Sequence, residues 1–117
     1  MTFVEIFIGR DQQRKRHPLP TYEEIEAIFE PAPIFDFSVT PEKHENMMFS
    51  QIDLLVRNLI PEHFDKLKAF LRERYPETDL CIEWFNERTN LYGGFRWFDG
   101  KDEWVEWGGN YYGMKGV

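Results

Sequence analysis

The segment PEHFDKLKAFLRERY, residues 61–75, constrains the fold more than any other part of this chain. Phe64, Leu67, Leu71 and Tyr75 recur at helical spacing, and one proline opens the segment while another follows it. An amphipathic helix of this length needs an apolar surface that covers its buried face. Segments rich in β-branched and aromatic residues lie on both sides of it, so the sequence predicts that this surface is a β-sheet.

The remaining segments predict a second helix and six strands. Residues 21–30 begin with Thr21 and Glu24 at the spacing of a capping box, and Pro31 ends the helical pattern. Strands are expected at residues 3–8, 34–39, 47–57, 79–87, 91–98 and 103–107. The order β-α-β-β-α-β-β-β predicts a single α+β domain over residues 1–117. We expect a two-layer sandwich, with two helices on one face of an antiparallel or mixed sheet.

Residues 41–59 fit two structures. As a helix starting at Thr40 and Pro41, the segment would place Ile52 and Val56 on one apolar face. As a strand over residues 47–57, alternate positions would be largely apolar and the opposite face would carry Gln51 and Asp53. The strand is preferred because it would form a hairpin with residues 34–39.

Composition predicts an ordered intracellular domain. With 117 residues and a hydrophobic content of 42%, the chain can bury a core without disulfides. It has no apolar run long enough to span a membrane, and its N-terminus lacks the pattern of a signal peptide. A single cysteine, Cys81, fits a reducing compartment, so a cytoplasmic location is expected.

Charge is unevenly distributed along the chain, whose formal net charge is −7. Residues 21–62 carry nine acidic and two basic side chains, whereas residues 10–17 carry four basic and one acidic. An acidic body repels phosphate, so direct nucleic-acid binding is not expected. The basic segment is interpreted as a solvated loop, with an anion-binding loop as the alternative. The residues of that alternative site are Arg10, Arg14, Lys15 and Arg16.

Residues 90–113 contain eight aromatic side chains among carboxylates and glycines. Because side chains alternate along a strand, one set should pack on the helices and the other should be exposed. An exposed aromatic face flanked by charges is typical of a protein interface. The glycine pairs at 93–94 and 108–109 are expected to mark bulges or sharp bends. The predicted partner-binding residues are Trp104, Trp107, Arg96, Asp99, Asp102, Glu103 and Glu106, with the two tryptophans as anchors.

Motifs for catalysis and metal binding are not found in the sequence. The three histidines lack metal-ligand spacing, no serine occupies a nucleophile elbow, and neither a metal nor a cofactor is expected. Cys81 is interpreted as a buried hydrophobe. Glutamates beside tryptophans, such as Glu83 beside Trp84, would suit a sugar-processing site, but ordinary solvent-facing strand positions are the preferred interpretation.

These features predict a small acidic, non-enzymatic protein that inhibits another protein by covering its basic surface. The profile, though no motif, resembles that of toxin-immunity proteins and of bacterial or phage antagonists of defence enzymes. Two alternatives remain open. One is an enzyme or binding protein for a small molecule or sugar, acting through the aromatic and carboxylate face. The other is a self-associating structural protein, a homodimer formed through a strand edge or the aromatic face.

Overall fold

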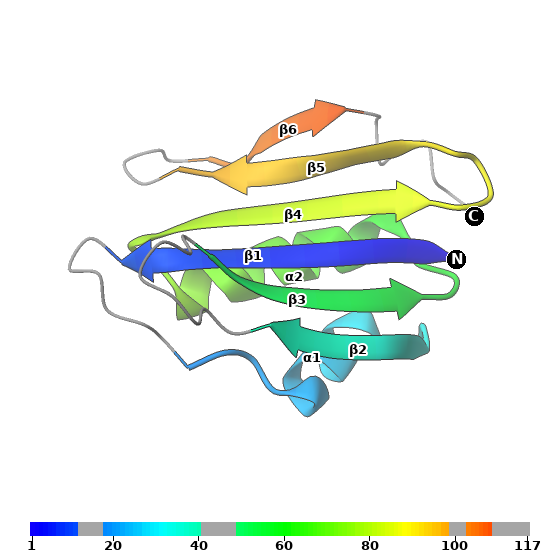
Figure 1. Cartoon of the computed structure of the whole chain (residues 1–117), viewed down its shortest axis with the longest axis horizontal. Helices are drawn as coiled ribbons and strands as arrows, with labels where there is room; N and C mark the ends of the chain where they lie inside the picture. The colour runs from blue at the N-terminus through cyan, green and yellow to red at the C-terminus, as the bar shows by residue number, and fades with distance from the viewer. Residues whose placement is uncertain (12–17, 41–48, 99–102, 109–117) are drawn as a thin grey trace.

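The computed structural model of the chain describes residues 1–11, 18–40, 49–98 and 103–108. Within them, two helices cover one face of an antiparallel six-stranded sheet, in the predicted order β-α-β-β-α-β-β-β (Figure 1). The helices are α1 (Tyr22–Phe29) and α2 (Pro61–Arg74). The strands are β1 (Thr2–Asp11), β2 (Ile34–Thr40), β3 (Phe49–Val56), β4 (Thr78–Asn86), β5 (Tyr92–Trp97) and β6 (Val105–Gly108).

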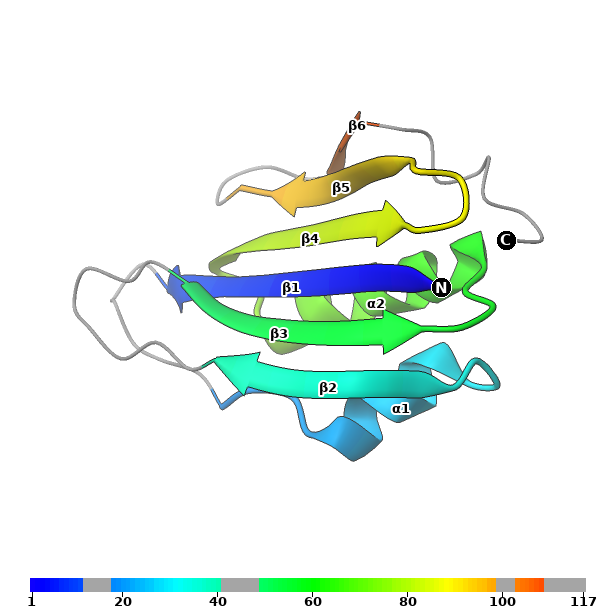
Figure 2. The same ribbon diagram turned by 45° about the vertical axis from the view of Figure 1, so that its right-hand side comes forward.

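The first strand along the chain is central in the sheet, whose strand order is β2-β3-β1-β4-β5-β6. β1 pairs antiparallel with β3 on one side and with β4 on the other. The first six elements therefore follow the split β-α-β arrangement of ferredoxin-like domains, and β5 and β6 extend the sheet beyond β4. Figure 2 shows from a second angle that both helices lie behind the sheet and leave its other face uncovered. Such an arrangement serves many functions and does not by itself define one.

Both helices begin where the sequence predicts. At α1 the Glu24 N–H donates to Thr21 Oγ1 over 3.2 Å and the Thr21 N–H donates to Glu24 Oε1 over 3.1 Å, which confirms the capping box. At α2 the Ile60 N–H donates to Nδ1 of the buried His63 over 3.1 Å. The His63 ring also lies 5.8 Å from the Phe29 ring and so connects the two helices. Neither helix is long and apolar enough to span a membrane in the part of the chain described above.

The core fills the space between the helices and the sheet. β1 contributes Val4 and Ile6, which are fully buried, and α2 contributes Phe64, Leu67 and Leu71, which are also fully buried. These residues keep water from one side of every central strand, so the buried side of the sheet is apolar.

The strand interpretation of residues 47–57 is confirmed over Phe49–Val56, which form β3 between β1 and β2. Ile52, Leu54 and Val56 face the helices and are buried, as the strand pattern predicts. The helical alternative is wrong for this segment because its backbone is paired with a neighbouring strand on each side. Residues 41–48 lie outside the described residues.

Candidate functional site

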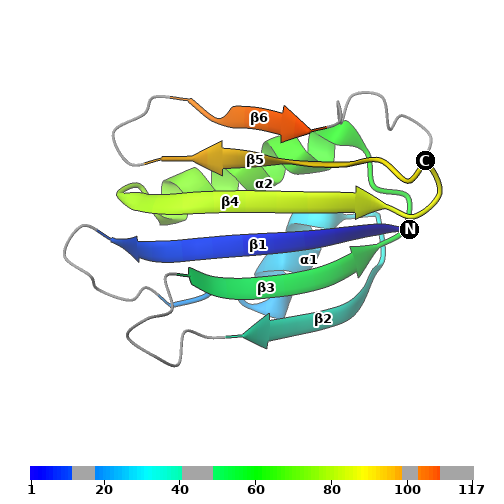
Figure 3. The same ribbon diagram turned by 45° about the horizontal axis from the view of Figure 1, so that its top comes forward.

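The open face of the sheet, defined as the side opposite the helices, is turned toward the viewer in Figure 3. Directly paired residues of neighbouring strands point to the same side, so the register arranges the open-face side chains in rows across the strands. One row, here called the aromatic row, crosses from β2 to β5. It consists of Phe35, Leu55, Phe3, Phe85 and Tyr92. Within it the Phe3 and Phe85 rings are stacked, with centroids 6.3 Å apart and an interplanar angle of 26°.

The next row across the strands is the acidic row, which consists of Asp53 of β3, Glu5 of β1 and Glu83 of β4. Glu5 is the direct partner of both other carboxylates. Partial burial raises the pKa of Glu5, and the charges of Asp53 and Glu83 raise it further. Like charges directly opposite one another destabilise a sheet, so this row opposes folding.

A neighbouring amide donates hydrogen bonds to the acidic row but does not neutralise its charge. Gln51 Nε2 donates to Asp53 Oδ1 over 2.7 Å and to Glu5 Oε2 over 3.4 Å. Within the described ranges, none of the three carboxylates forms an ion pair with Lys or Arg. The acidic row also does not converge on a point, since no group of His, Cys, Asp or Glu in the described part of the chain could hold a metal ion.

Trp107 of β6 continues the acidic row beyond β5, where its direct partner is Gly94. A Cβ atom on Gly94 would lie 2.7 Å from the Trp107 ring and 2.5 Å from the Ile82 carbonyl oxygen. The glycine therefore lets the indole lie across β5. Of the bulge or sharp bend predicted at Gly93 and Gly94, the bulge is wrong, because β5 keeps a regular register with β4 and β6 there. Gly108 has φ of +79°, a conformation that glycine favours, and this fits the bend expected at that position.

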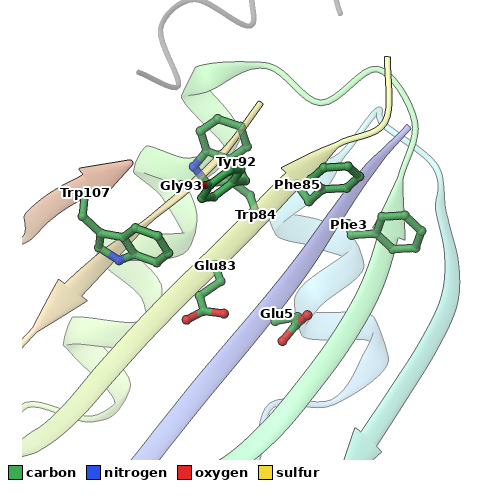
Figure 4. Close-up of a pocket in the computed structure, with 8 residues that line it drawn as sticks. All are labelled: Phe3, Glu5, Glu83, Trp84, Phe85, Tyr92, Gly93 and Trp107. Carbon is green, nitrogen blue, oxygen red and sulfur yellow. The ribbon is translucent and has the colours of Figure 1, made fainter. Parts of the chain in front are cut away.

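A shallow pocket of about 150 Å³ opens between the two rows on β1, β4 and β5 (Figure 4). Figure 4 shows the Glu5 and Glu83 carboxylates side by side, with Phe85 and Phe3 at one end of them and the Trp107 indole reaching toward Glu83 from β6. The remaining lining residues are Trp84, Tyr92 and Gly93.

The predicted partner-binding residues fall on two sides of the sheet. Arg96 and Trp107 lie on the open face, together with Val105 and the exposed Phe98. Glu106 is paired with Phe95 on the side of the helices and is exposed at the sheet edge. Glu103 precedes β6 and is exposed. The positions Asp99 and Asp102 lie outside the described residues.

Trp104, the other predicted anchor, packs on the core side. Its ring lies 5.8 Å from that of Trp97 in an edge-to-face arrangement, and it is only partly exposed. The Arg72 guanidinium of α2 lies 3.3 Å from the centre of the Trp97 ring on the same side. The stack of Arg72, Trp97 and Trp104 therefore connects the β5–β6 hairpin to α2.

Two other predicted features have simple outcomes. The alternative anion-binding residues Arg14, Lys15 and Arg16 lie outside the described residues, and Arg10 is placed in β1 by its backbone alone. Cys81 is buried, as predicted, and burial raises the pKa of its thiol to about 11. The thiol is therefore protonated at neutral pH and is a poor nucleophile.

Sequence patterns did not identify the part of the site that comes from β1, from β3 and from Phe85 of β4. Phe3, Glu5, Asp53 and Phe85 belong to the two rows but were not among the predicted site residues. Their signal is the alternation in residues 3–8, where Phe3 and Glu5 share the face opposite to the apolar one. That pattern shows which side chains share a face of β1, but not that β1 lies between β3 and β4.

Comparisons of the chain with protein-family models, with curated proteins and with solved structures found no match. We therefore infer the function from the residues of the open face and their geometry.

Proposed function

We propose that this protein binds another protein through the open face of its sheet, and that it inhibits that partner by covering a basic surface. The observation that carries the proposal is the acidic row, three carboxylates placed side by side next to the exposed aromatic row. No requirement of folding explains this arrangement, because like charges in direct register oppose the folded state. A cationic partner would remove the repulsion on binding.

The aromatic row supports a macromolecular partner. The exposed fractions are 41% for Phe3, 36% for Phe85 and 62% for Tyr92. Phe35, Phe98 and Val105 are exposed on the same face, so six of the ten large exposed hydrophobic side chains of the described residues are concentrated there. Contiguous exposed apolar surface with charges at its edges is a feature of protein-binding sites.

Charge argues against a nucleic-acid partner for the same face. Aromatic rings on an open sheet stack with bases in RNA-recognition modules, where basic residues complement the phosphates. Here the aromatic row lies beside Glu5, Asp53 and Glu83, and the whole chain has a net charge of −7. A phosphate backbone laid across this face would be repelled, whereas lysines and arginines of a protein would be attracted.

Site-specific crosslinking tests the proposal. We would replace Phe85 on the open face with a photoreactive benzoylphenylalanine, and the exposed Ala69 of α2 in a matched control. Each protein would be irradiated in a lysate of the cells that produce it, and the crosslinked peptide would be sequenced by mass spectrometry. We expect a product from position 85 but not from position 69, joined to a surface segment rich in lysine and arginine.

The partner is then purified and its activity is measured with increasing amounts of this protein. Loss of that activity at stoichiometric ratios supports inhibition by occlusion. Equal crosslinking from both positions, or a crosslinked segment without net positive charge, would contradict the proposal.

A further inference from the structure

The pocket between the aromatic and acidic rows has the chemistry of a site for one cationic side chain. Its walls include the rings of Phe3, Phe85, Tyr92 and Trp107, and the Glu5 and Glu83 carboxylates lie side by side within it. Glu5 and Glu83 are direct cross-strand partners, so both can reach one planar group placed between them.

Two arginines of this chain lie over aromatic rings at the margins of the open face. Arg57 lies 5.9 Å from the centre of the Phe35 ring and Arg96 lies 5.1 Å from the centre of the Phe98 ring, both on the open face. These two pairs flank the pocket. Of the residues that the structure describes, none places a cation over the four rings of the pocket itself. The chain's own arginines thus cover the aromatic rings at the margins of the open face and leave the central rings free for a ligand.

The indole of Trp107, which forms one wall of the pocket, carries an N–H group without a partner in the described part of the chain. The Nε1 atoms of Trp107 and of Trp84, another lining residue, are both buried and have no hydrogen-bond acceptor among the described residues. A buried donor without an acceptor costs free energy, which a ligand carbonyl oxygen would recover. A peptide supplies such a carbonyl next to each of its side chains.

We propose that this pocket binds the side chain of an arginine in the partner protein. The guanidinium donates hydrogen bonds to Glu5 and Glu83 and stacks on the aromatic walls, while a main-chain carbonyl beside it accepts from Trp107 Nε1. Arginine fits better than lysine because its planar group presents five donors, stacks on rings and is less strongly hydrated. The inference rests on the proposed function, for which it names the residue that is recognised.

Titration of the full chain with short peptides tests the arginine pocket. We would label the protein with ¹⁵N and follow the indole N–H resonance of Trp107, with the buried Trp97, which does not line the pocket, as an internal reference. The probes are acetyl-Gly-Arg-Gly-amide, the same peptide with citrulline, which keeps the shape without the charge, and the same peptide with lysine. We expect the arginine peptide to shift the Trp107 resonance saturably, and the citrulline peptide to bind at least about tenfold more weakly.

Substitutions in the acidic row test whether its carboxylates bind the arginine peptide. Glu83→Gln and Glu5→Gln should each weaken binding of the arginine peptide by about three- to tenfold. Glu73→Gln removes one charge from the exposed surface of α2 and serves as the matched control, so its affinity should be unchanged.

Equal binding of the arginine and citrulline peptides would overturn the inference. Binding of a neutral disaccharide such as cellobiose without binding of the arginine peptide would also overturn it, and would assign the pocket to a carbohydrate. Neither result decides whether the open face binds a protein, because crosslinking from position 85 tests that proposal independently. The two proposals can therefore be told apart if one of them is wrong.

Discussion

At the scale of single residues, Glu5 shows how the open face differs from a surface selected for stability alone. Its carboxylate is partly buried and lies opposite two others, and both effects favour the protonated form. A group whose pKa is raised by folding binds protons more tightly in the folded state, so its ionisation opposes folding as the pH rises.

Replacing Glu5 with glutamine should therefore stabilise the protein. We expect Glu5→Gln to raise the free energy of unfolding at pH 7 by about 0.5–1 kcal/mol, because it removes two like-charge contacts. The gain should be small below the unfolded pKa of about 4.5 and complete above the raised pKa of the folded state. Urea denaturation between pH 4 and pH 8 measures it, with Glu73→Gln as the control. A variant less stable than the parent at pH 7 would show that Glu5 supports the fold.

His63 makes the opposite contribution to pH dependence. Burial lowers the pKa of its imidazole, and Nδ1 must remain unprotonated to accept the hydrogen bond from the Ile60 N–H at the start of α2. The unfolded chain therefore binds a proton at this site more readily than the folded chain. The stability that His63 contributes is complete above the ordinary pKa of about 6.5 and is lost as the pH falls through the lowered folded value.

His63→Asn tests this contribution, because the asparagine side-chain oxygen can replace Nδ1 as acceptor and does not titrate. We expect the variant to lose the decrease in stability that the parent shows as the pH falls below about 6.5. Thermal unfolding at pH 7.5, 6.5 and 5.5 checks the prediction. Parallel pH profiles for the two proteins would assign the dependence to other groups.

At the scale of the elements, the β5–β6 hairpin places one tryptophan on the side of the helices and another on the open face. Trp104 packs on Trp97, which is covered by Arg72 of α2, whereas Trp107 lies across Gly94 on the open face. Alternation along the strand therefore gives the two predicted anchors different roles.

Truncation of each tryptophan should separate stability from binding. Trp104→Ala should lower the free energy of unfolding by about 2–4 kcal/mol with little effect on the affinity of the folded protein. Trp107→Ala should be less destabilising and should weaken partner binding by about 2 kcal/mol. Urea denaturation gives the stabilities, and the Glu83 amide resonance follows the arginine peptide. A folded Trp107→Ala protein with full affinity would remove Trp107 from the site.

Local sequence patterns predict most of the elements because their signals are contained within a few residues. Thr21 and Glu24 mark the start of α1, prolines bound α2, and alternation identifies β3. The site could be predicted only in part, because its rows depend on which strands are neighbours. Glu5 and Glu83 are 78 positions apart, and only the pairing of β1 with β4 brings them together. Local patterns do not specify which distant strands pair with one another.

At the scale of the whole molecule, the charged open face should control how fast the partner binds. Association of oppositely charged proteins is accelerated by long-range attraction, which dissolved salt screens. The effect should depend on the position of the carboxylates as well as on the net charge of −7.

Two doubly substituted variants of equal net charge test this dependence. We expect association of the parent with its partner to slow by at least about tenfold between 50 and 500 mM NaCl. The variant with Glu5→Gln and Glu83→Gln should have a smaller salt dependence than the variant with Glu23→Gln and Glu73→Gln, whose charges lie on the helices. Stopped-flow kinetics measures the rates. Equal salt dependence in the two variants would show that net charge alone attracts the partner.

The central position of β1 also determines when the binding surface can form. Of the six strands described, the ribosome makes β1 before the others, but one of its two neighbours, β4, ends at Asn86. Glu5 and Phe3 therefore meet Glu83 and Phe85 only after the whole segment from β1 to β4 has left the ribosome. Closing a loop of this length is slow in comparison with forming a helix. An incomplete chain has neither the assembled acidic row nor the pocket, so only the completed fold is competent to capture a partner.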